Sequence, residues 1–411
     1  MRNRKALYKQ KCCIINAMDM ADGGNQIALA AFAVSLAGIG TFFLNPLLIA
    51  AGGFFSRGIK EQYSDTLPMV SIVTVVRNGR ALIQAKIENA LALDYPHDKL
   101  ELIIYSDGST DGIEETVRAF TCEQVRFCSS AGHEGKNAGM NNAVKHCAGE
   151  IIVFSDADAL FEKDALRFLV RHFGDPDVGG VCGSRVIAEK GHSLSKPQWS
   201  YIKFDTLIKS LESKSGSISS NDGKIYAVRK NLYRPIPDKV TDDLFVALSI
   251  VSQKRRFVFE PEAVTFVRTP SRNMEHEVER RRRIVGGSLN GIWLMRELLN
   301  PFKFGIFAVR LFINKVLRRM LPLFLIMLFF SSLYLSCKIL LAALLFLFQA
   351  AFYSGAFSYY LIFSRIKEIK IITKTTALAF YFCIGNYGAL RGCMDFLMGN
   401  QVGKWTPTKG V

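Results

Sequence analysis

The chain has 411 residues, with 52 Lys or Arg against 36 Asp or Glu, so its formal net charge is +16, and 49% of its residues are hydrophobic. A chain of this length can bury a large core. The positive charge could suit nucleic acid, but the basic residues cluster beside apolar stretches, which indicates anionic lipid instead. No zinc-finger spacing or RNA-binding signature is present, so we expect membrane lipids as partners and no nucleic acid.

The N-terminal part pairs a basic tail, residues 1–24, with an apolar segment, residues 25–56. The segment is long enough for one transmembrane helix, but Asn45-Pro46 interrupts it and allows a broken hairpin instead. Positive tails normally stay cytoplasmic, and a single span would then place the following domain on the other side. The number of spans stays open at this point.

Residues 66–292 are predicted to form one soluble α/β domain. Apolar, β-branched runs at 70–76, 100–106 and 151–154 alternate with segments of helical period at 82–91 and 166–170. Strands that alternate with amphipathic helices predict βαβ units and a mostly parallel, Rossmann-like sheet. The polar residues that follow each strand are then expected to meet at one edge of the sheet.

Acidic residues follow two of these strands. Asp107 comes directly after the run 100–106, and Asp156 and Asp158 come after the run 151–154. Two carboxylates this close can share a divalent cation, since Mg²⁺ usually takes one or two protein carboxylates together with substrate phosphates. Taken alone, the pair could equally be solvated turn aspartates.

Two further polar positions open predicted helices. Lys136 stands at the start of a helix expected over 137–147, where a cation and free backbone N–H groups both favour phosphate; the alternative is a solvated surface lysine. Asp242 and Asp243 precede the apolar run 244–248 and therefore lie in the first turn of a helix, where one of them could act as an N-cap.

Together these motifs resemble the nucleotide-sugar domain of family 2 glycosyltransferases. The blocks at 107–111, 135–141, 156–158 and 241–243 occur in the family's order, and the resemblance covers roughly residues 68–290. A single D-x-D is weak evidence, but four ordered blocks in the expected strand and helix contexts are specific. The resemblance implies a GT-A fold, an inverting transfer and a divalent metal, Mg²⁺ or Mn²⁺.

The resemblance also implies roles for individual residues. Asp158 and Asp156 are the metal ligands, while Asp107, Lys136 and Arg77 belong to the nucleotide and donor region. Asp243 matches the general base of the family's T-E-D motif, and Asp242 stands in place of the glutamate. The loop at 77–80 departs from the family's pattern, since it lacks the Asn-Glu of many relatives. The Gly/Ser-rich stretch 215–224 is expected to be a mobile loop, in a region that helps form the family's acceptor site.

Four consecutive arginines occupy positions 280–283. They could be a solvated helix face or a patch for anionic lipid, or Arg282 and Arg283 could reach the diphosphate, because a guanidinium group suits phosphate. Processive synthases of the family carry Q-x-x-R-W near this position. Here Arg280 stands in the glutamine position and Ile284 in the tryptophan position, which favours one sugar per encounter over processive synthesis.

The C-terminal part is predicted to be membrane-associated. Residues 300–320 suit an amphipathic helix in the bilayer interface, or an ordinary helix on the domain. Residues 321–400 suit two to three transmembrane helices, the last of which contains Arg391 and Asp395 and could be a shallower or re-entrant helix. The tail 401–411 resembles the family's K-x-W ending.

We therefore expect a multi-pass protein of the inner or plasma membrane with a cytoplasmic catalytic domain. The expected activity is that of a hexosyltransferase-type enzyme that moves a sugar from a nucleotide-diphosphate donor, a UDP-sugar, to a lipid-linked or surface-polysaccharide acceptor, without processivity. Two alternatives stay open. One is transfer of a single sugar to a polyprenyl-phosphate or ceramide-like lipid, and the other is a catalytically silent scaffold in a polysaccharide assembly complex.

Overall fold

The computed structural model describes residues 23–44, 66–120, 122–187, 196–267, 274–363 and 370–400, with the single positions 46, 49 and 63. Most of the predicted basic tail, much of 45–56 and all of 401–411 lie outside the described residues. The chain divides into two compact units. The helical unit comprises the described residues of 1–44, 277–282 and 317–391, and the sheet unit comprises those of 45–276, 283–316 and 392–411.

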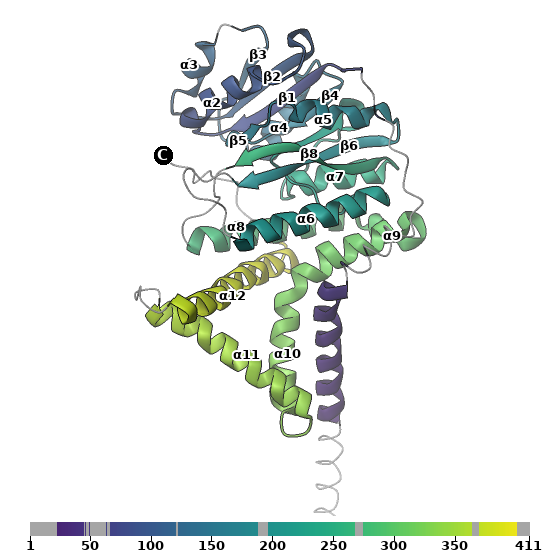
Figure 1. Cartoon of the computed structure of the whole chain (residues 1–411), viewed down its shortest axis with the longest axis vertical. Helices are drawn as coiled ribbons and strands as arrows, with labels where there is room; N and C mark the ends of the chain where they lie inside the picture. Colours follow the sequence, from purple (N-terminus) through teal and green to yellow (C-terminus); the bar gives the residue numbers. More distant parts are fainter. Residues whose placement is uncertain are drawn as a thin grey trace, which may run out of the picture. The chain divides into compact units, whose positions relative to one another are not determined.

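Within its described residues, the sheet unit is built around an eight-stranded sheet (Figure 1). In spatial order its strands are β3 (Val125–Ser130), β2 (Leu100–Asp107), β1 (Val70–Val76), β4 (Ile151–Phe154), β7 (Tyr226–Arg229), β6 (Val178–Ile187), β8 (Arg256–Val267) and β5 (Ala159–Phe161). Four of the seven pairings are parallel, and the antiparallel ones involve β5 and β7. The predicted α/β class is confirmed, with a mixed sheet.

Helices cover both faces of the sheet because its central strands bury both sets of alternating side chains. On β1, Val73 and Val75 belong to one apolar cluster, while Ile72 and Val76 belong to a second cluster. The first cluster includes residues of α4 (Lys136–Lys145) and α7 (Asp242–Ser252), and the second includes residues of α2 (Arg80–Leu91), α3 (Ile113–Arg118) and α5 (Ala165–Arg171). Loops at the strand ends are thereby held between two packed layers.

The sheet unit contains further helices and short helical turns. They are α6 (Lys196–Lys214), the second half of α8 (Met274–Leu294), α9 (Pro301–Leu311), the π-helical turn η5 (Phe312–Val316), and the short turns η1 (His97–Lys99), η2 (His172–Gly174), η3 (Lys230–Leu232) and η4 (Arg296–Leu299). Phe307 and Leu311 of α9 are buried in the same cluster as α7, while Phe302 and Ile306 are exposed. The helix therefore has both a packed face and exposed apolar residues.

The helical unit contains helix Gly23–Leu44, η6 (Leu317–Met320), α10 (Leu321–Leu335), α11 (Leu340–Ser358), the π-helical turn η7 (Tyr359–Phe363) and most of α12 (Lys370–Leu397). Phe32 of the first helix packs with Leu328 and Leu335 of α10 and with Ala342 of α11. Three stretches among the described residues are long and apolar enough to cross a membrane, namely Gly23–Leu44, Pro301–Leu335 and Leu340–Ile362.

Helix α12 is not one of those three stretches. Its Arg391 forms an ion pair of 2.9 Å with Glu279 at the start of α8, and its Asp395 is buried. Intramembrane charges are costly unless they are paired, so the pairing of Arg391 fits a helix that lies against other protein. Whether α12 spans the membrane stays a prediction.

Candidate functional site

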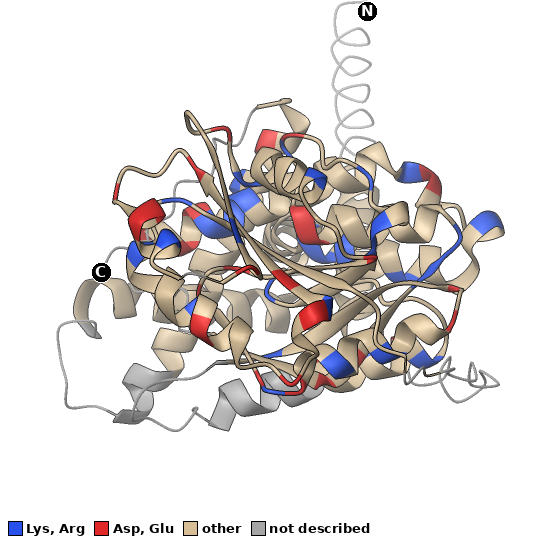
Figure 2. Cartoon of the chain, turned by 90° about the horizontal axis from the view of Figure 1, so that it is seen from above, with Lys and Arg blue, Asp and Glu red and all other residues tan. Residues whose placement is uncertain are grey.

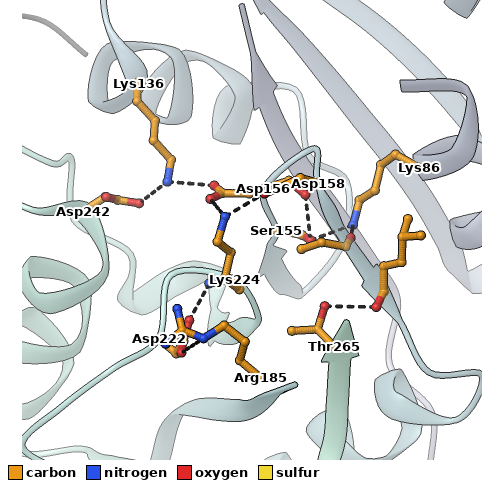
Figure 3. Close-up of polar contacts among 12 residues, drawn as sticks. Lys86, Lys136, Ser155, Asp156, Asp158, Arg185, Asp222, Lys224, Asp242 and Thr265 are labelled. Carbon is orange, nitrogen blue, oxygen red and sulfur yellow. Dashed lines mark hydrogen bonds and ion pairs between the residues drawn. The ribbon is translucent and has the colours of Figure 1, made fainter. Parts of the chain in front are cut away.

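The two aspartates after β4 share one cation, the ammonium of Lys224. Its Nζ lies 2.7 Å from Oδ2 of Asp156 and 2.8 Å from Oδ1 of Asp158, in the loop where β4 ends (Figure 3). In the view from above, Lys and Arg residues are interspersed with Asp and Glu residues along the ribbon (Figure 2). At the end of β4, the ammonium of Lys224 compensates the negative charge of Asp156 and Asp158.

A second lysine links the pair to the start of α7. Lys136, the first residue of α4, lies 2.9 Å from Oδ1 of Asp156 and 2.8 Å from Oδ2 of Asp242. The structure therefore brings Asp156, Asp158, Asp242 and Lys136 together, although they come from three separate parts of the chain.

A third lysine supports the loop from within the protein. Lys86 of α2 is 1% exposed, and its Nζ donates to Oγ of Ser155 at 2.6 Å and to the carbonyl oxygen of Ala159 at 2.7 Å. Burial lowers the pKa of Lys86 to about 7, although the nearby Asp156 and Asp158 favour its charged form. Its hydrogen bonds close the turn that carries both aspartates.

Lys136 and Lys224 are held in their charged form. Burial alone disfavours the ammonium of Lys224, but Asp156 and Asp158 raise its pKa above the usual value. Lys136 behaves in the same way between Asp156 and Asp242. In return, although burial acts in the other direction, Lys136 and Lys224 hold the pKa of Asp156 well below its usual range. The site is thus a set of interlocked ion pairs.

The sheet register explains why Lys224 reaches this place. Strand β7 pairs antiparallel with β4, with Tyr226 opposite Phe154. Continuing that register by two residues places Lys224 opposite Asp156. The loop before β7 is fixed by Asp222, whose Oδ1 accepts a hydrogen bond from the backbone N–H of Lys224 at 3.1 Å. Although 215–224 was expected to be mobile, Ser217, Ile218 and Ser219 are buried.

Asp243 lies beside the same loop. Its side chain approaches Gly223, and its backbone carbonyl accepts a hydrogen bond of 3.0 Å from Nδ2 of Asn221. Burial, followed by the charge of Asp242, raises the pKa of Asp243 to about 6. Thr241, not either aspartate, is the N-cap of α7. A carboxylate with a pKa near neutrality is suited to accept a proton.

Asp107 has a different environment. Its carboxylate is 1% exposed and accepts hydrogen bonds from the backbone N–H groups of Glu134 (2.7 Å) and Gly135 (3.0 Å), while Nδ1 of His133 lies 2.8 Å away. Gly135 has a φ of 102°, a conformation that favours glycine. Asp107 therefore anchors the start of α4, and its predicted contact with the nucleotide stays a prediction.

The asparagines of the 135–141 block hold the segment that leads to α7. Nδ2 of Asn137 donates to the carbonyl oxygens of Pro237 (2.9 Å) and Val240 (3.1 Å). Asn141 donates to the carbonyl oxygen of Ile236 at 2.9 Å and accepts from its N–H at 2.8 Å. This block therefore positions both Lys136 and the loop that carries the predicted base.

The three predicted arginines have separate outcomes. Nη1 of Arg77 is buried without a hydrogen-bond partner among the described residues, which leaves a donor for a ligand at the end of β1. Arg282 pairs with Glu279 on its own helix at 3.3 Å and belongs to the helical unit. Arg283 belongs to the sheet unit. Contacts of Arg282 and Arg283 with a diphosphate stay predictions.

The donor set at Asp156 and Asp158 fits a hard divalent cation. Among the described residues no group of three or more His, Cys, Asp or Glu side chains could hold a metal ion by itself. Two carboxylates suit Mg²⁺ or Mn²⁺ only when water and substrate phosphate complete the coordination, and that is the usual arrangement for Mg²⁺.

Sequence reasoning missed three residues of this region, namely Lys86, His133 and Lys224. Lys86 lies within an amphipathic helical pattern and was indistinguishable from a surface lysine. His133 belongs to none of the motifs that the sequence analysis singled out. Lys224 depends on the antiparallel pairing of β7 with β4, for which the sequence carries no local signal.

The mixed eight-stranded sheet has the arrangement of a GT-A glycosyltransferase domain. Residues 71–232 match the family model "Glycosyl transferase family 2", and the chain is therefore similar to this family over those residues. Among solved structures it resembles mannosyltransferase PcManGT from Pyrobaculum calidifontis, solved with GDP-Man and Mn²⁺. The TM-score is 0.65 at 22% identity, covering 91% of this chain and 99% of that one, which shows a shared fold.

Curated relatives include poly-beta-1,6-N-acetyl-D-glucosamine synthases. That of Staphylococcus epidermidis is 26% identical over 208 residues, which make up 49% of this chain and 50% of the relative. That of Staphylococcus aureus (strain COL) is 25% identical over 231 residues, covering 53% and 56% of the two chains. The match thus spans about half the length of these relatives.

Proposed function

We propose that this protein is a membrane-bound, inverting glycosyltransferase that moves a sugar from a nucleotide-diphosphate donor, a UDP-sugar, to a lipid-linked or surface-polysaccharide acceptor, with a divalent metal. The catalytic domain faces the cytoplasm, and one sugar is added per encounter. The observation that carries the proposal is the meeting of Asp156, Asp158 and Asp242 with Lys136 and Lys224 where β4 ends. Asp243 lies beside Gly223 in the loop that carries Lys224.

The reaction joins an acceptor hydroxyl oxygen to the anomeric carbon of the sugar as the bond from that carbon to the diphosphate breaks. Asp243 accepts the hydroxyl proton, for which its raised pKa suits it. Lys136 and Lys224 face the carboxylates and can stabilise the negative charge that grows on the leaving diphosphate. Asp156 and Asp158 would hold Mg²⁺ or Mn²⁺, which neutralises the same charge when bound.

The test is a screen of sugar nucleotides with full-length protein in nanodiscs. UDP- and GDP-sugars are incubated with Mn²⁺ or Mg²⁺, and release of the nucleoside diphosphate is measured with and without a chelator. We expect release for at least one donor, dependent on metal and lost in Asp243→Asn when acceptor is present. Asp98→Asn, an exposed position on η1, is the matched control. No release with any donor would favour a silent scaffold.

A second candidate, transfer of a single sugar to a lipid phosphate, is favoured by Lys315. Its Nζ donates to Oγ of Ser220 at 2.8 Å, and its charge acts on the carboxylate of Asp243. A cation beside the base suits an anionic acceptor such as a polyprenyl phosphate. Mass spectrometry of lipid extracts after incubation with labelled donors separates the two, since this candidate yields only monosaccharide lipids.

A further inference from the structure

Lys224 occupies the oxygens that the proposed metal would need. Its ammonium is within hydrogen-bond distance of both Asp156 and Asp158 (Figure 3). The side chain is 18% exposed, so little water competes for these contacts. The chain therefore carries its own cation on the predicted metal ligands.

An ammonium group and a divalent cation cannot both use these oxygens at low cost. Each hydrogen bond from Lys224 occupies a carboxylate lone pair, and a divalent ion a few ångströms from a positive charge is repelled by much more than thermal energy. Metal binding thus requires the ammonium of Lys224 to leave.

The local structure allows that movement. The backbone of Lys224 is fixed by Asp222, which in turn lies 3.4 Å from Nε of Arg185. Only the flexible four-carbon side chain has to turn, and a lysine ammonium is a compact charge that adapts readily to phosphate. A metal–diphosphate complex supplies both the incoming cation and the new partner for Lys224.

We propose that Lys224 is a displaceable counter-cation of the metal site. In the donor-free protein it neutralises Asp156 and Asp158 and keeps the affinity for free divalent metal low. When a nucleotide diphosphate arrives with its metal, the ammonium moves from the carboxylates to phosphate oxygens. Metal and donor therefore bind as a pair, an ordering that deepens the proposed function and rests on it.

The experiment measures Mn²⁺ binding to the full chain in nanodiscs without nucleotide, from the electron paramagnetic resonance signal of free Mn²⁺. Lys224→Met removes the charge and keeps the side-chain length, with Lys224→Gln as a second neutral variant. We expect both to bind Mn²⁺ at least about tenfold more tightly than wild type, because one repulsive charge is gone. Lys224→Arg keeps the charge and Lys163→Met alters an exposed lysine, so both should match wild type.

Adding UDP or GDP completes the test. In wild type, the nucleotide should raise the affinity for Mn²⁺ because it draws Lys224 away from the carboxylates. In Lys224→Met this increase in affinity should be about tenfold smaller than in wild type, because no ammonium has to leave. Equal Mn²⁺ affinity of folded wild-type and Lys224→Met protein without nucleotide would overturn the inference, while binding in the presence of nucleotide would leave the proposed function intact. If neither protein bound Mn²⁺ even with UDP or GDP, the metal-dependent function would fail as well.

Discussion

Two acidic sites at the ends of parallel strands have opposite surroundings. The carboxylate of Asp107, the last residue of β2, accepts hydrogen bonds from two backbone N–H groups and lies against His133. The carboxylates of Asp156 and Asp158, after β4, are instead bound by a lysine ammonium. The two sites look alike in sequence, since each has aspartates directly after an apolar strand.

The two sites differ in whether the groups that bind the carboxylates can move away. Backbone N–H groups cannot leave without unfolding the loop, so Asp107 acts as a fixed anchor for the start of α4. Lysine side chains can turn away, so the pair at 156 and 158 can exchange one cation for another. We therefore expect mutations at the first site to affect stability and mutations at the second to affect activity.

The largest effect is expected for Asp158→Asn. It removes one of the two proposed metal ligands, and metal stabilisation of a leaving group is worth several kcal/mol, so transfer should fall by about 10⁴-fold. Metal-dependent turnover is the readout, and circular dichroism should stay unchanged. Turnover equal to that of the Asp98→Asn control would remove the metal site from the mechanism.

Asp243→Asn should follow, with a loss of about 10³-fold in transfer, because general-base catalysis contributes on this scale. In wild type the base must be deprotonated, and its pKa is raised to about 6. We therefore expect kcat/KM to fall as the pH drops below about 6, in a full pH profile with saturating metal. An acid limb that survives in Asp243→Asn would assign the titration to another group.

Asp107→Asn tests the anchor. An amide nitrogen in place of one oxygen faces a backbone N–H donor and leaves it unsatisfied, which should lower the free energy of unfolding by about 1–3 kcal/mol. Thermal unfolding of the full chain, followed by intrinsic fluorescence, measures this. Asp158→Asn should cost less, because Lys224 keeps Asp156 as a partner; the reverse order would contradict the comparison.

The smallest effect is expected for Asp242→Asn. The charge of Asp242 raises the pKa of Asp243, and Asp242 also pairs with Lys136. Removing it should shift the acid limb of kcat/KM to lower pH by roughly one unit or less. A shift to higher pH would mean that Asp242 does not act on the base through its charge.

Local patterns predicted much of the fold. The runs at 70–76 and 151–154 are β1 and β4, and β2 extends the run 100–106 by one residue. The helix expected over 137–147 is α4, Lys136–Lys145. The strands follow from short continuous apolar, β-branched runs that end in polar residues, a signal that acts within a few residues.

Local sequence patterns could not predict the contacts between segments that are distant in the chain. Asn137 and Asn141 were recognised by resemblance, but their role in holding residues 236–240 appears only in the hydrogen bonds. The sequence pattern does not distinguish Lys86 from other lysines of a helix. Its hydrogen bond to Oγ of Ser155 exists only because α2 packs against the loop that carries Ser155.

The sequence by itself determined that acidic residues would stand at the ends of strands in an α/β domain, because apolar runs and turn residues encode elements locally. Only the tertiary structure decided which positive groups face those acids. That choice depends on strand order and register, here the reversal of β7 beside β4, which places Lys224 opposite Asp156. The physical reason is that charges interact through space over a few ångströms, whereas Lys224 and Asp156 are 68 residues apart in the chain.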